Sequence, residues 1–296
     1  MLKRYKGTEG RRLAYETYDR LLEMWGVDKK ELDINTRYGK THLITAGSRE
    51  NPPLLLFHGV GDNSAMMWTY NAAELSKHYY LMAVDAIGGS GKSEPDERYY
   101  NGVDQTLWID DVLNGLGIDK TYIAGVSYGS YLTQLYAIER PERVYKAVCM
   151  AGAIALNTLK GNGMRGMLVF IPEALFPSEK NAMKLIKKLC GSNTAVFTDN
   201  KVLLQHWLYL LKYFNNRCMM MHKLKKFDEK QVAGIREKIL VMIGDCDKIA
   251  YSPEVIKMLE EHGIRHHIIK DTGHAINHER AEFVNSEMIK FFSGCV

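Results

Sequence analysis

Short apolar runs alternate with helical stretches along most of this 296-residue chain. The run at 54–57 is an uninterrupted Leu-Leu-Leu-Phe, which is typical of a strand buried on both faces. Similar runs lie at 79–84, 121–124, 144–150, 239–243 and 266–270, and helical patterns lie at 64–77, 104–116 and 281–292. Because parallel neighbours need a crossover between them, this alternation predicts an α/β fold. We expect a mostly parallel, doubly wound sheet, with ligands bound beyond the carboxyl ends of its strands.

One of these strand ends carries the pentapeptide Gly-Val-Ser-Tyr-Gly at 125–129, followed by a helical stretch. A serine between two glycines on a strand-to-helix turn is the nucleophile-elbow pattern G-x-S-x-G. The glycines allow a sharp turn that holds the hydroxyl of Ser127 clear of the backbone. The helix then directs its free N–H groups towards developing negative charge. Because glycine and serine are common, the pattern indicates catalysis only if the chain also supplies a base, an acid and an oxyanion hole.

A candidate base and two candidate acids follow the serine in the order that such a triad requires. His274 lies in a loop directly after the predicted strand at 266–270. Asp245 and Asp247 follow the strand at 239–243, whereas no carboxylate follows the strand that ends at residue 150. Asp245 stands at the strand end, while Asp247 lies two residues into the loop, where its side chain can turn towards the base. This placement makes Asp247 a candidate for the acid, with Asp245 as the alternative.

The oxyanion hole is expected from two backbone N–H groups. His-Gly-Val-Gly at 58–61 forms a glycine-flanked loop after a buried strand, and the N–H of Val60 can point inwards from it. The second donor is the N–H of Tyr128, the residue after the candidate nucleophile. His58 is expected to fix the loop rather than to transfer protons.

Two other motifs suggest different chemistry. His274 and His278, with Glu279, form a His-x-x-x-His-Glu pattern that could hold a metal, but no third ligand comes from a matching site, so we expect none. The segment at 86–93, Ala-Ile-Gly-Gly-Ser-Gly-Lys-Ser, resembles a phosphate-binding loop. It has alanine where that pattern requires glycine, and no amphipathic helix follows it. We expect a tight turn there and no nucleotide or other cofactor.

In order and spacing, the chain resembles the α/β-hydrolase superfamily, in its serine-hydrolase, carboxylesterase-like branch. The resemblance covers about 32–292 without the middle region, and rests on the motifs at 56–61, 84–93, 125–129, 244–247 and 272–274. It implies that Ser127 is the nucleophile, His274 the base and then the acid, and Asp247 the residue that orients it. It also implies that Val60 and Tyr128 donate to the oxyanion. A serine nucleophile disfavours haloalkane dehalogenases and epoxide hydrolases, which have aspartate there. Ser130 departs from the pattern, since many relatives have glycine at that position.

The stretch at about 153–232 interrupts the strand–helix alternation and has a helical composition. We therefore expect an α/β core made of 1–152 and 233–296, with an N-terminal helical extension at 1–31 and a helical cap inserted at 153–232. The cap holds 13 lysine and arginine residues against 5 aspartate and glutamate residues. Two interpretations stay open: a solvated lid face, or a surface that steers anionic acyl compounds towards the cleft.

Composition narrows the remaining classes. The net charge of +4 is too small over this length to indicate nucleic-acid binding. No apolar run is long enough for a membrane span, and we expect no signal peptide because no apolar segment follows the charged N-terminus. The cysteines are odd in number and contain no C-x-x-C, which favours reduced thiols in the cytoplasm: Cys149, Cys190, Cys218, Cys246 and Cys295.

These observations predict hydrolysis of a small-molecule carboxylic ester or related acyl compound through an acyl-enzyme, without metal or organic cofactor. A thioesterase, a lactonase, a C–C bond hydrolase and a perhydrolase are compatible with the same triad. A ligand-binding receptor with little turnover is the alternative outside the enzymes. Neither the substrate nor the oligomeric state can be deduced from the sequence.

Overall fold

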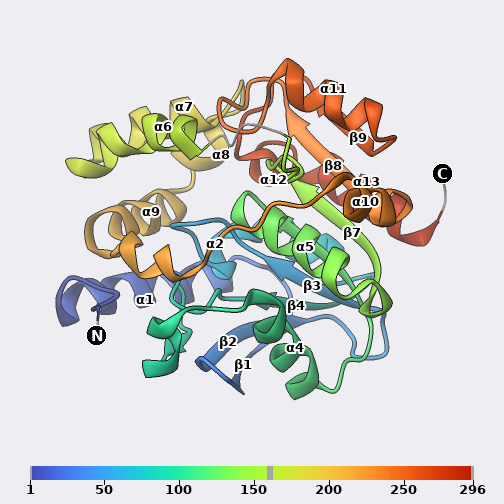
Figure 1. Cartoon of the computed structure of the whole chain (residues 1–296). Helices are drawn as coiled ribbons and strands as arrows, with labels where there is room; N and C mark the ends of the chain where they lie inside the picture. Colours follow the sequence, from blue (N-terminus) through green and yellow to red (C-terminus); the bar gives the residue numbers. More distant parts are fainter. Residues whose placement is uncertain (1, 159–162, 295–296) are drawn as a thin grey trace.

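The structure, a computed structural model, describes residues 2–158 and 163–294 (Figure 1). Within these residues a nine-stranded sheet runs in the order β1-β2-β4-β3-β6-β7-β8-β9, and β5 pairs with β2. Every pair from β4 to β9 is parallel, whereas β2 is antiparallel to β1, β4 and β5. The predicted mostly parallel sheet is therefore confirmed. The strands are β1 (Lys29–Thr36), β2 (Gly39–Ala46), β3 (Pro53–Phe57), β4 (Tyr80–Val84), β5 (Glu94–Pro95), β6 (Thr121–Val126), β7 (Val144–Met150), β8 (Ile239–Gly244) and β9 (Arg265–Ile269).

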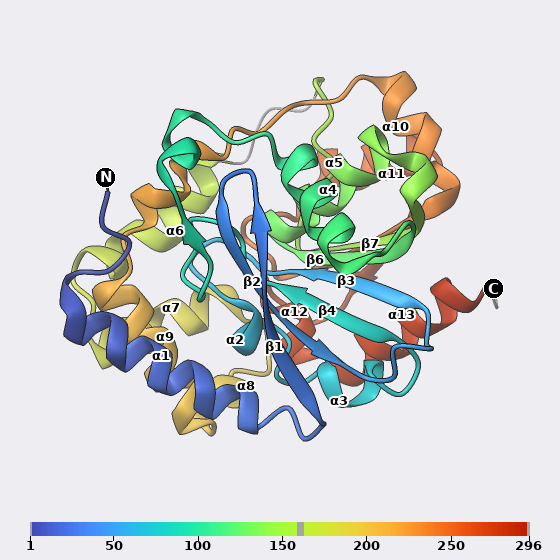
Figure 2. The same ribbon diagram turned by 90° about the horizontal axis from the view of Figure 1, so that it is seen from below.

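Helices cover both faces of the sheet, as the doubly wound prediction requires, and Figure 2 shows the sheet between the two groups. One face carries α4 (Gln105–Leu116), α5 (Tyr128–Glu139), α10 (Glu229–Ile235) and α11 (Pro253–Glu261). The other carries α1 (Gly7–Glu23), α2 (Ser64–Met67), α3 (Ala72–Leu75), α12 (Ile276–Glu279) and α13 (Ala281–Ser293). Because both faces are covered, the Leu-Leu-Leu run of β3 is fully buried. Three short 3₁₀ helices join elements of the core: η1 (Glu97–Asn101), η2 (Pro141–Arg143) and η4 (Arg236–Lys238).

Between β7 and α10 the chain forms a helical group beside the sheet (Figure 1). It consists of α6 (Gly163–Leu175), α7 (Glu179–Leu189), α8 (Ala195–Thr198), α9 (Lys201–Tyr213) and the 3₁₀ helix η3 (Asn216–Met221). Helix α9 packs against α1, and the buried ring of His206 joins them: its Nδ1 lies 2.7 Å from Thr17 Oγ1. The Asn63 amide nitrogen lies 2.8 Å from His206 Nε2, which ties this group to the loop after β3.

The segment at 64–77 differs from the single helix that the sequence predicted. It forms two four-residue helices, α2 and α3, separated by residues 68–71. Asn63 caps α2, because its side chain accepts a hydrogen bond from Met66 N at 3.2 Å. Asn71 is buried between the two helices, and its side-chain amide donates to Asn285 of α13 at 2.8 Å. These side-chain contacts break a pattern that apolar spacing alone presents as continuous.

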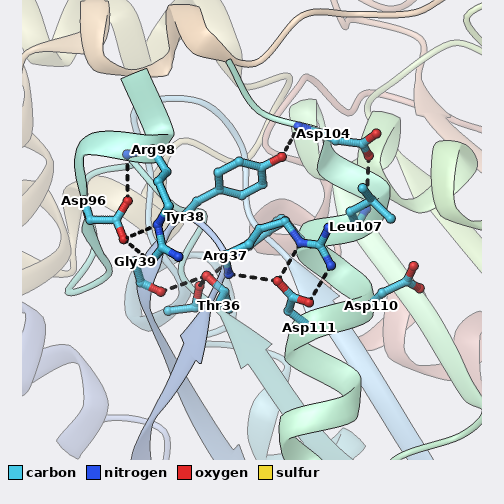
Figure 3. A network of polar contacts seen from close by, with 12 residues as sticks. Thr36, Arg37, Tyr38, Gly39, Asp96, Arg98, Asp104, Leu107, Asp110 and Asp111 are labelled. Atoms are coloured by element: carbon cyan, nitrogen blue, oxygen red, sulfur yellow. Dashed lines mark hydrogen bonds and ion pairs between the residues drawn. The ribbon is translucent and has the colours of Figure 1, made fainter. Parts of the chain in front are cut away.

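The turn between β1 and β2 is held by a polar network that Figure 3 shows. Asp111 of α4 accepts hydrogen bonds from Arg37 through the backbone N–H, Nε and one terminal nitrogen, each at 2.8 Å. The Tyr38 hydroxyl accepts a hydrogen bond from Asp104 N at 2.9 Å, at the start of the same helix. The antiparallel edge of the sheet is thereby fastened to the helix that precedes β6.

The sequence predicted no membrane-spanning helix and cysteines that remain reduced. In residues 2–158 and 163–294, no helix has the length and apolar character needed to cross a bilayer. Cys149, Cys190 and Cys218 are buried and Cys246 is exposed, all four as free thiols. Cys295 lies outside the described residues.

Candidate active site

Ser127 occupies a sharp turn between β6 and α5. Its backbone has φ 57° and ψ −113°, a conformation that residues other than glycine rarely adopt. A Cβ at Gly125 would lie 2.2 Å from the backbone of Gly129, and one at Gly129 would lie 2.4 Å from the carbonyl oxygen of Phe57. Only glycine fits at either position, so both glycines of the motif are explained by packing around the turn.

The structure brings Ser127, His274 and Asp247 together at the carboxyl ends of their strands. His274 Nε2 lies 3.0 Å from Ser127 Oγ, and His274 Nδ1 lies 2.9 Å from Asp247 Oδ2. The other oxygen of Asp247 accepts hydrogen bonds from the backbone N–H groups of Ile249 at 2.8 Å and Ala250 at 3.0 Å. An Nδ1–H that donates to Asp247 leaves the lone pair of Nε2 free to accept the serine proton.

Asp245, the alternative acid, lies outside this chain of hydrogen bonds. Its Oδ1 accepts a long hydrogen bond of 3.4 Å from Thr272 N, and its own N–H donates to Ile269 O. It therefore fastens the loop after β8 to the loop after β9. Of the two carboxylates, only Asp247 contacts the base.

Burial and charge act in opposite directions on the two ionisable members. Burial lowers the pKa of His274, but the charge and hydrogen bond of Asp247, with the charge of Asp62, raise it above the ordinary histidine value. Burial likewise raises the pKa of Asp247, and the contacts with His274, Ala250 and Ile249 lower it below its ordinary value. The pair is thus arranged to keep Asp247 ionised and to stabilise a proton on His274.

The two predicted oxyanion donors flank Ser127. The N–H of Tyr128 opens α5, where the first N–H groups lack intrahelical acceptors. Val60 lies in the loop after β3, and the described residues offer no hydrogen-bond acceptor to its N–H. His58 fixes this loop: its Nδ1 lies 2.7 Å from Gly59 O, and its Nε2 accepts from Ala86 N at 2.9 Å. Burial lowers the pKa of His58, consistent with a neutral structural ring.

Glu279 is a residue of this site that the sequence pattern suggested only as a metal ligand. Its buried carboxylate accepts hydrogen bonds from the backbone N–H of Gly273 and that of Gly191, both at 2.8 Å. His274 N also donates to Leu189 O at 2.6 Å. The loop that carries the candidate base is therefore bonded directly to the end of α7. No signal in the sequence pairs Glu279 with Gly191, because the partner is a backbone group 88 residues away.

Neither alternative motif forms the site it suggested. Among the described residues no three His, Cys, Asp or Glu side chains are grouped to hold a metal, and His278 Nε2 donates to Met66 O at 3.1 Å. The glycine-rich turn at 86–93 wraps around the buried carboxylate of Asp85, which accepts from Lys92 N at 2.7 Å. A Cβ at Gly91 would lie 2.1 Å from that carboxylate. The turn thus surrounds a side chain of the protein itself.

Two cavities meet at Ser127 and Val60. The smaller, of about 100 Å³, is lined mainly by apolar side chains from α2 and the cap helices and includes His274. The larger, of about 360 Å³, extends along Tyr128, Tyr131 and the segment after β7. The exposed lysines of α7, Lys184 and Lys187, line neither cavity, whereas Lys225 and Lys226 of the predicted cap line the larger one, so both interpretations of the basic cap stay open.

Comparison with known proteins agrees with the fold described above. The family model described as alpha/beta hydrolase fold matches residues 52–183. Carboxylesterase YbfK of Bacillus subtilis is 27% identical over 287 residues, covering 95% of this chain and 93% of that protein. Its crystal structure superimposes with a TM-score of 0.81 at 25% identity, over 98% of this chain and 100% of that one. The chain has the α/β-hydrolase fold.

A second solved structure, that of naproxen esterase of Bacillus subtilis, has the same fold and superimposes with a TM-score of 0.80 at 24% identity, over 97% of this chain and 99% of that one. In this chain the turn with Ser127 follows β6, the loop with Asp247 follows β8 and the loop with His274 follows β9. Ser130, the departure noted in the elbow, is fully buried, and a Cβ at Gly152 would lie 2.6 Å from its hydroxyl. A glycine in the loop after β7 thus supplies the space that Ser130 uses.

Proposed function

We propose that this chain is a serine hydrolase that cleaves carboxylic esters through an acyl-enzyme, with Ser127 as nucleophile, His274 as base and Asp247 as its orienting acid. The observation that carries the proposal is the unbroken hydrogen-bonded series Ser127 Oγ–His274–Asp247 beside two cavities. The names of the two Bacillus subtilis esterases support an ester as the substrate.

In the first step, Ser127 Oγ attacks the ester carbonyl carbon while its proton moves to His274 Nε2. The carbonyl oxygen becomes an oxyanion held by the N–H groups of Val60 and Tyr128. Collapse of this intermediate breaks the bond to the alcohol oxygen, which takes the proton from His274. Water then enters by the same route: it gives a proton to His274, attacks the acyl carbon and releases the acid as Oγ regains the proton.

The partners and the compartment form a second part of the proposal. A small acyl compound is the expected substrate, because the cavities beside Ser127 total a few hundred Å³. Buried free thiols at Cys149, Cys190 and Cys218 support a reducing compartment such as the cytoplasm.

Replacement of Ser127 by alanine tests the mechanism. We expect Ser127→Ala to lose hydrolysis of p-nitrophenyl esters and covalent labelling by a fluorophosphonate, with an unchanged melting temperature. Retention of either the activity or the label would refute the assignment. Thioesters and lactones of the same acyl groups, assayed beside the esters, identify the bond that is cleaved, and a single burst without turnover would favour a receptor.

A further inference from the structure

The two cavities differ in their relation to the base. His274 lines the smaller cavity and is absent from the wall of the larger one. In the tetrahedral intermediate the leaving oxygen must lie near His274 Nε2 to receive its proton, while the acyl chain extends away from it. The smaller cavity is therefore on the side of the alcohol, and the larger cavity is on the side of the acyl chain.

The smaller cavity has room for a small alcohol only. A cavity of about 150 Å³ accommodates benzene, with six non-hydrogen atoms, so about 100 Å³ corresponds to roughly four. Most of its wall is apolar, contributed by Met66, Met67, Phe170, Ile186, Leu189, Phe197 and Trp207. An apolar wall by itself would select a short alkyl alcohol.

Three polar side chains interrupt this wall, and each has a buried atom without a hydrogen-bond partner among the described residues: Asp62 Oδ1, Asn277 Oδ1 and His278 Nδ1. The Asn277 amide nitrogen donates to Met67 O at 2.5 Å, which leaves its oxygen as an acceptor. His278 donates through Nε2, and burial lowers its pKa to about 4, so its Nδ1 is a lone pair. All three atoms can thus accept a hydrogen bond. A buried acceptor without a donor is unfavourable, so each of these atoms favours a ligand that supplies one.

We propose that the smaller cavity binds the alcohol part of the ester and that Asp62 selects alcohols carrying a second hydrogen-bond donor, a hydroxyl or a protonated amino group. The proposal rests on the proposed ester hydrolysis. Asp62 directly follows the oxyanion loop and lines the same small cavity as His274, so a donor separated from the leaving oxygen by two carbon atoms fits within this cavity. Asn277 and His278 add acceptors to the same wall. The substrate class is then an ester of a larger acyl group with a glycol-like or amino alcohol.

The electrostatics of Asp62 agree with this role. Burial raises the pKa of Asp62 to about 7, and the charge of His274 opposes the rise. A hydrogen-bond donor on the substrate stabilises the ionised form of Asp62, whose buried Oδ1 otherwise has no hydrogen-bond partner among the described residues. Asp62 also raises the pKa of His274, so its effect on the base must be separated experimentally from its effect on the alcohol.

Matched esters of one acid, for example hexanoic acid, isolate the contribution of the donor. Propyl, 2-hydroxyethyl and 2-aminoethyl hexanoate have alcohols of equal length that end in a methyl, a hydroxyl and an ammonium group. 2-Methoxyethyl hexanoate retains the electron-withdrawing oxygen without its donor. We expect kcat/KM, measured in a pH-stat near pH 7.5, to be about tenfold to hundredfold higher for the two donor-bearing esters than for the propyl and methoxyethyl esters. Equal values for all four esters would overturn the proposal.

Variants of Asp62 assign the preference to this residue. Asp62→Leu should reduce the hydroxyethyl-to-propyl ratio of kcat/KM to near one. Asp62→Asn, which keeps an acceptor but loses the charge, should retain part of the hydroxyethyl preference and lose the aminoethyl preference. Asp111→Ala removes a carboxylate that lines neither cavity and should leave the ratios unchanged. A uniform loss across all esters in Asp62→Leu would place its effect on His274 and contradict the proposal.

The controls separate this inference from the proposed function. Fluorophosphonate labelling and the melting temperature show whether each variant is folded with a reactive Ser127. A wild-type protein that is labelled and hydrolyses all four esters without preference refutes only the role of Asp62. A folded wild-type protein that neither reacts with the label nor cleaves any ester refutes the proposed function itself.

Discussion

Replacement of Asp247 by asparagine should disable the base by changing which nitrogen of His274 carries the proton. Asp247 Oδ1 accepts hydrogen bonds from the backbone N–H groups of Ile249 and Ala250, at 2.8 and 3.0 Å. The carbonyl oxygen of an asparagine must take this position, because an NH₂ group there would face two donors. Its NH₂ group is then directed at His274 Nδ1, where Oδ2 accepts at 2.9 Å in the wild type.

An NH₂ group in this place needs an acceptor, so Nδ1 loses its proton and Nε2 gains one. Protonated Nε2 cannot accept the proton of Ser127, 3.0 Å away. We expect kcat to fall by about 10³–10⁴-fold, which corresponds to about 4–5.5 kcal/mol in the activation free energy. Stopped-flow and steady-state hydrolysis of a p-nitrophenyl ester, with active-site titration of folded protein, measures this directly.

Asp245→Asn is the matched control, since it makes the same chemical change two residues away. The Asp245 carboxylate accepts a 3.4 Å hydrogen bond from Thr272 N and makes no hydrogen bond to His274, so kcat of this variant should stay within a few-fold of the wild type. The reasoning fails if Asp247→Asn retains a tenth of the wild-type kcat, or if the two variants lose activity equally.

Three further outcomes follow from contacts described above. A protonated His274 cannot accept the serine proton, so kcat/KM should fall as the pH decreases through the pKa of His274. Because this pKa is raised, we expect the midpoint of the pH–rate profile above the ordinary histidine value of about 6.5, and a midpoint below that value would contradict the reasoning. Glu279→Ala leaves the buried N–H of Gly273 without its acceptor, and should lower both kcat and, by about 2–3 kcal/mol in urea titration, the free energy of unfolding. Asp111→Ala removes three hydrogen bonds to Arg37 far from the site, and should cost about 1–2 kcal/mol of stability with kcat unchanged.

The sequence predicted the sheet and the triad geometry through the same physical rule. Strands buried on both faces must be continuously apolar, so runs such as 54–57 and 239–243 reveal both the strand and where it ends. Polar residues just after those ends, Ser127, Asp247 and His274, then have to meet at one edge of a parallel sheet. This inference needs no knowledge of side-chain conformations, and the distances among the three residues agree with it.

The sequence could not predict features that depend on contacts distant along the chain. Helix α2 ends at Met67, and Asn71, in the break before α3, donates a buried hydrogen bond to Asn285 of α13, which lies more than 200 residues away. The carboxylate oxygens of Glu279 accept hydrogen bonds from backbone N–H groups, which no sequence pattern marks. Asp62 directly follows the oxyanion loop at 58–61, but the missing hydrogen-bond partner of its Oδ1 depends on side chains from distant parts of the chain that surround it.

The predicted cap at 153–232 is defined by the order of elements along the chain, but it is also hydrogen-bonded to the loop that carries His274. Leu189 O, at the end of α7, accepts a hydrogen bond from His274 N, and Gly191 N donates one to the Glu279 carboxylate. Leu189 also lines the smaller cavity. A displacement of α7 would thus move a wall of the alcohol site and the base together. The segment that shapes the substrate site is, by these hydrogen bonds, also part of the support of the catalytic histidine.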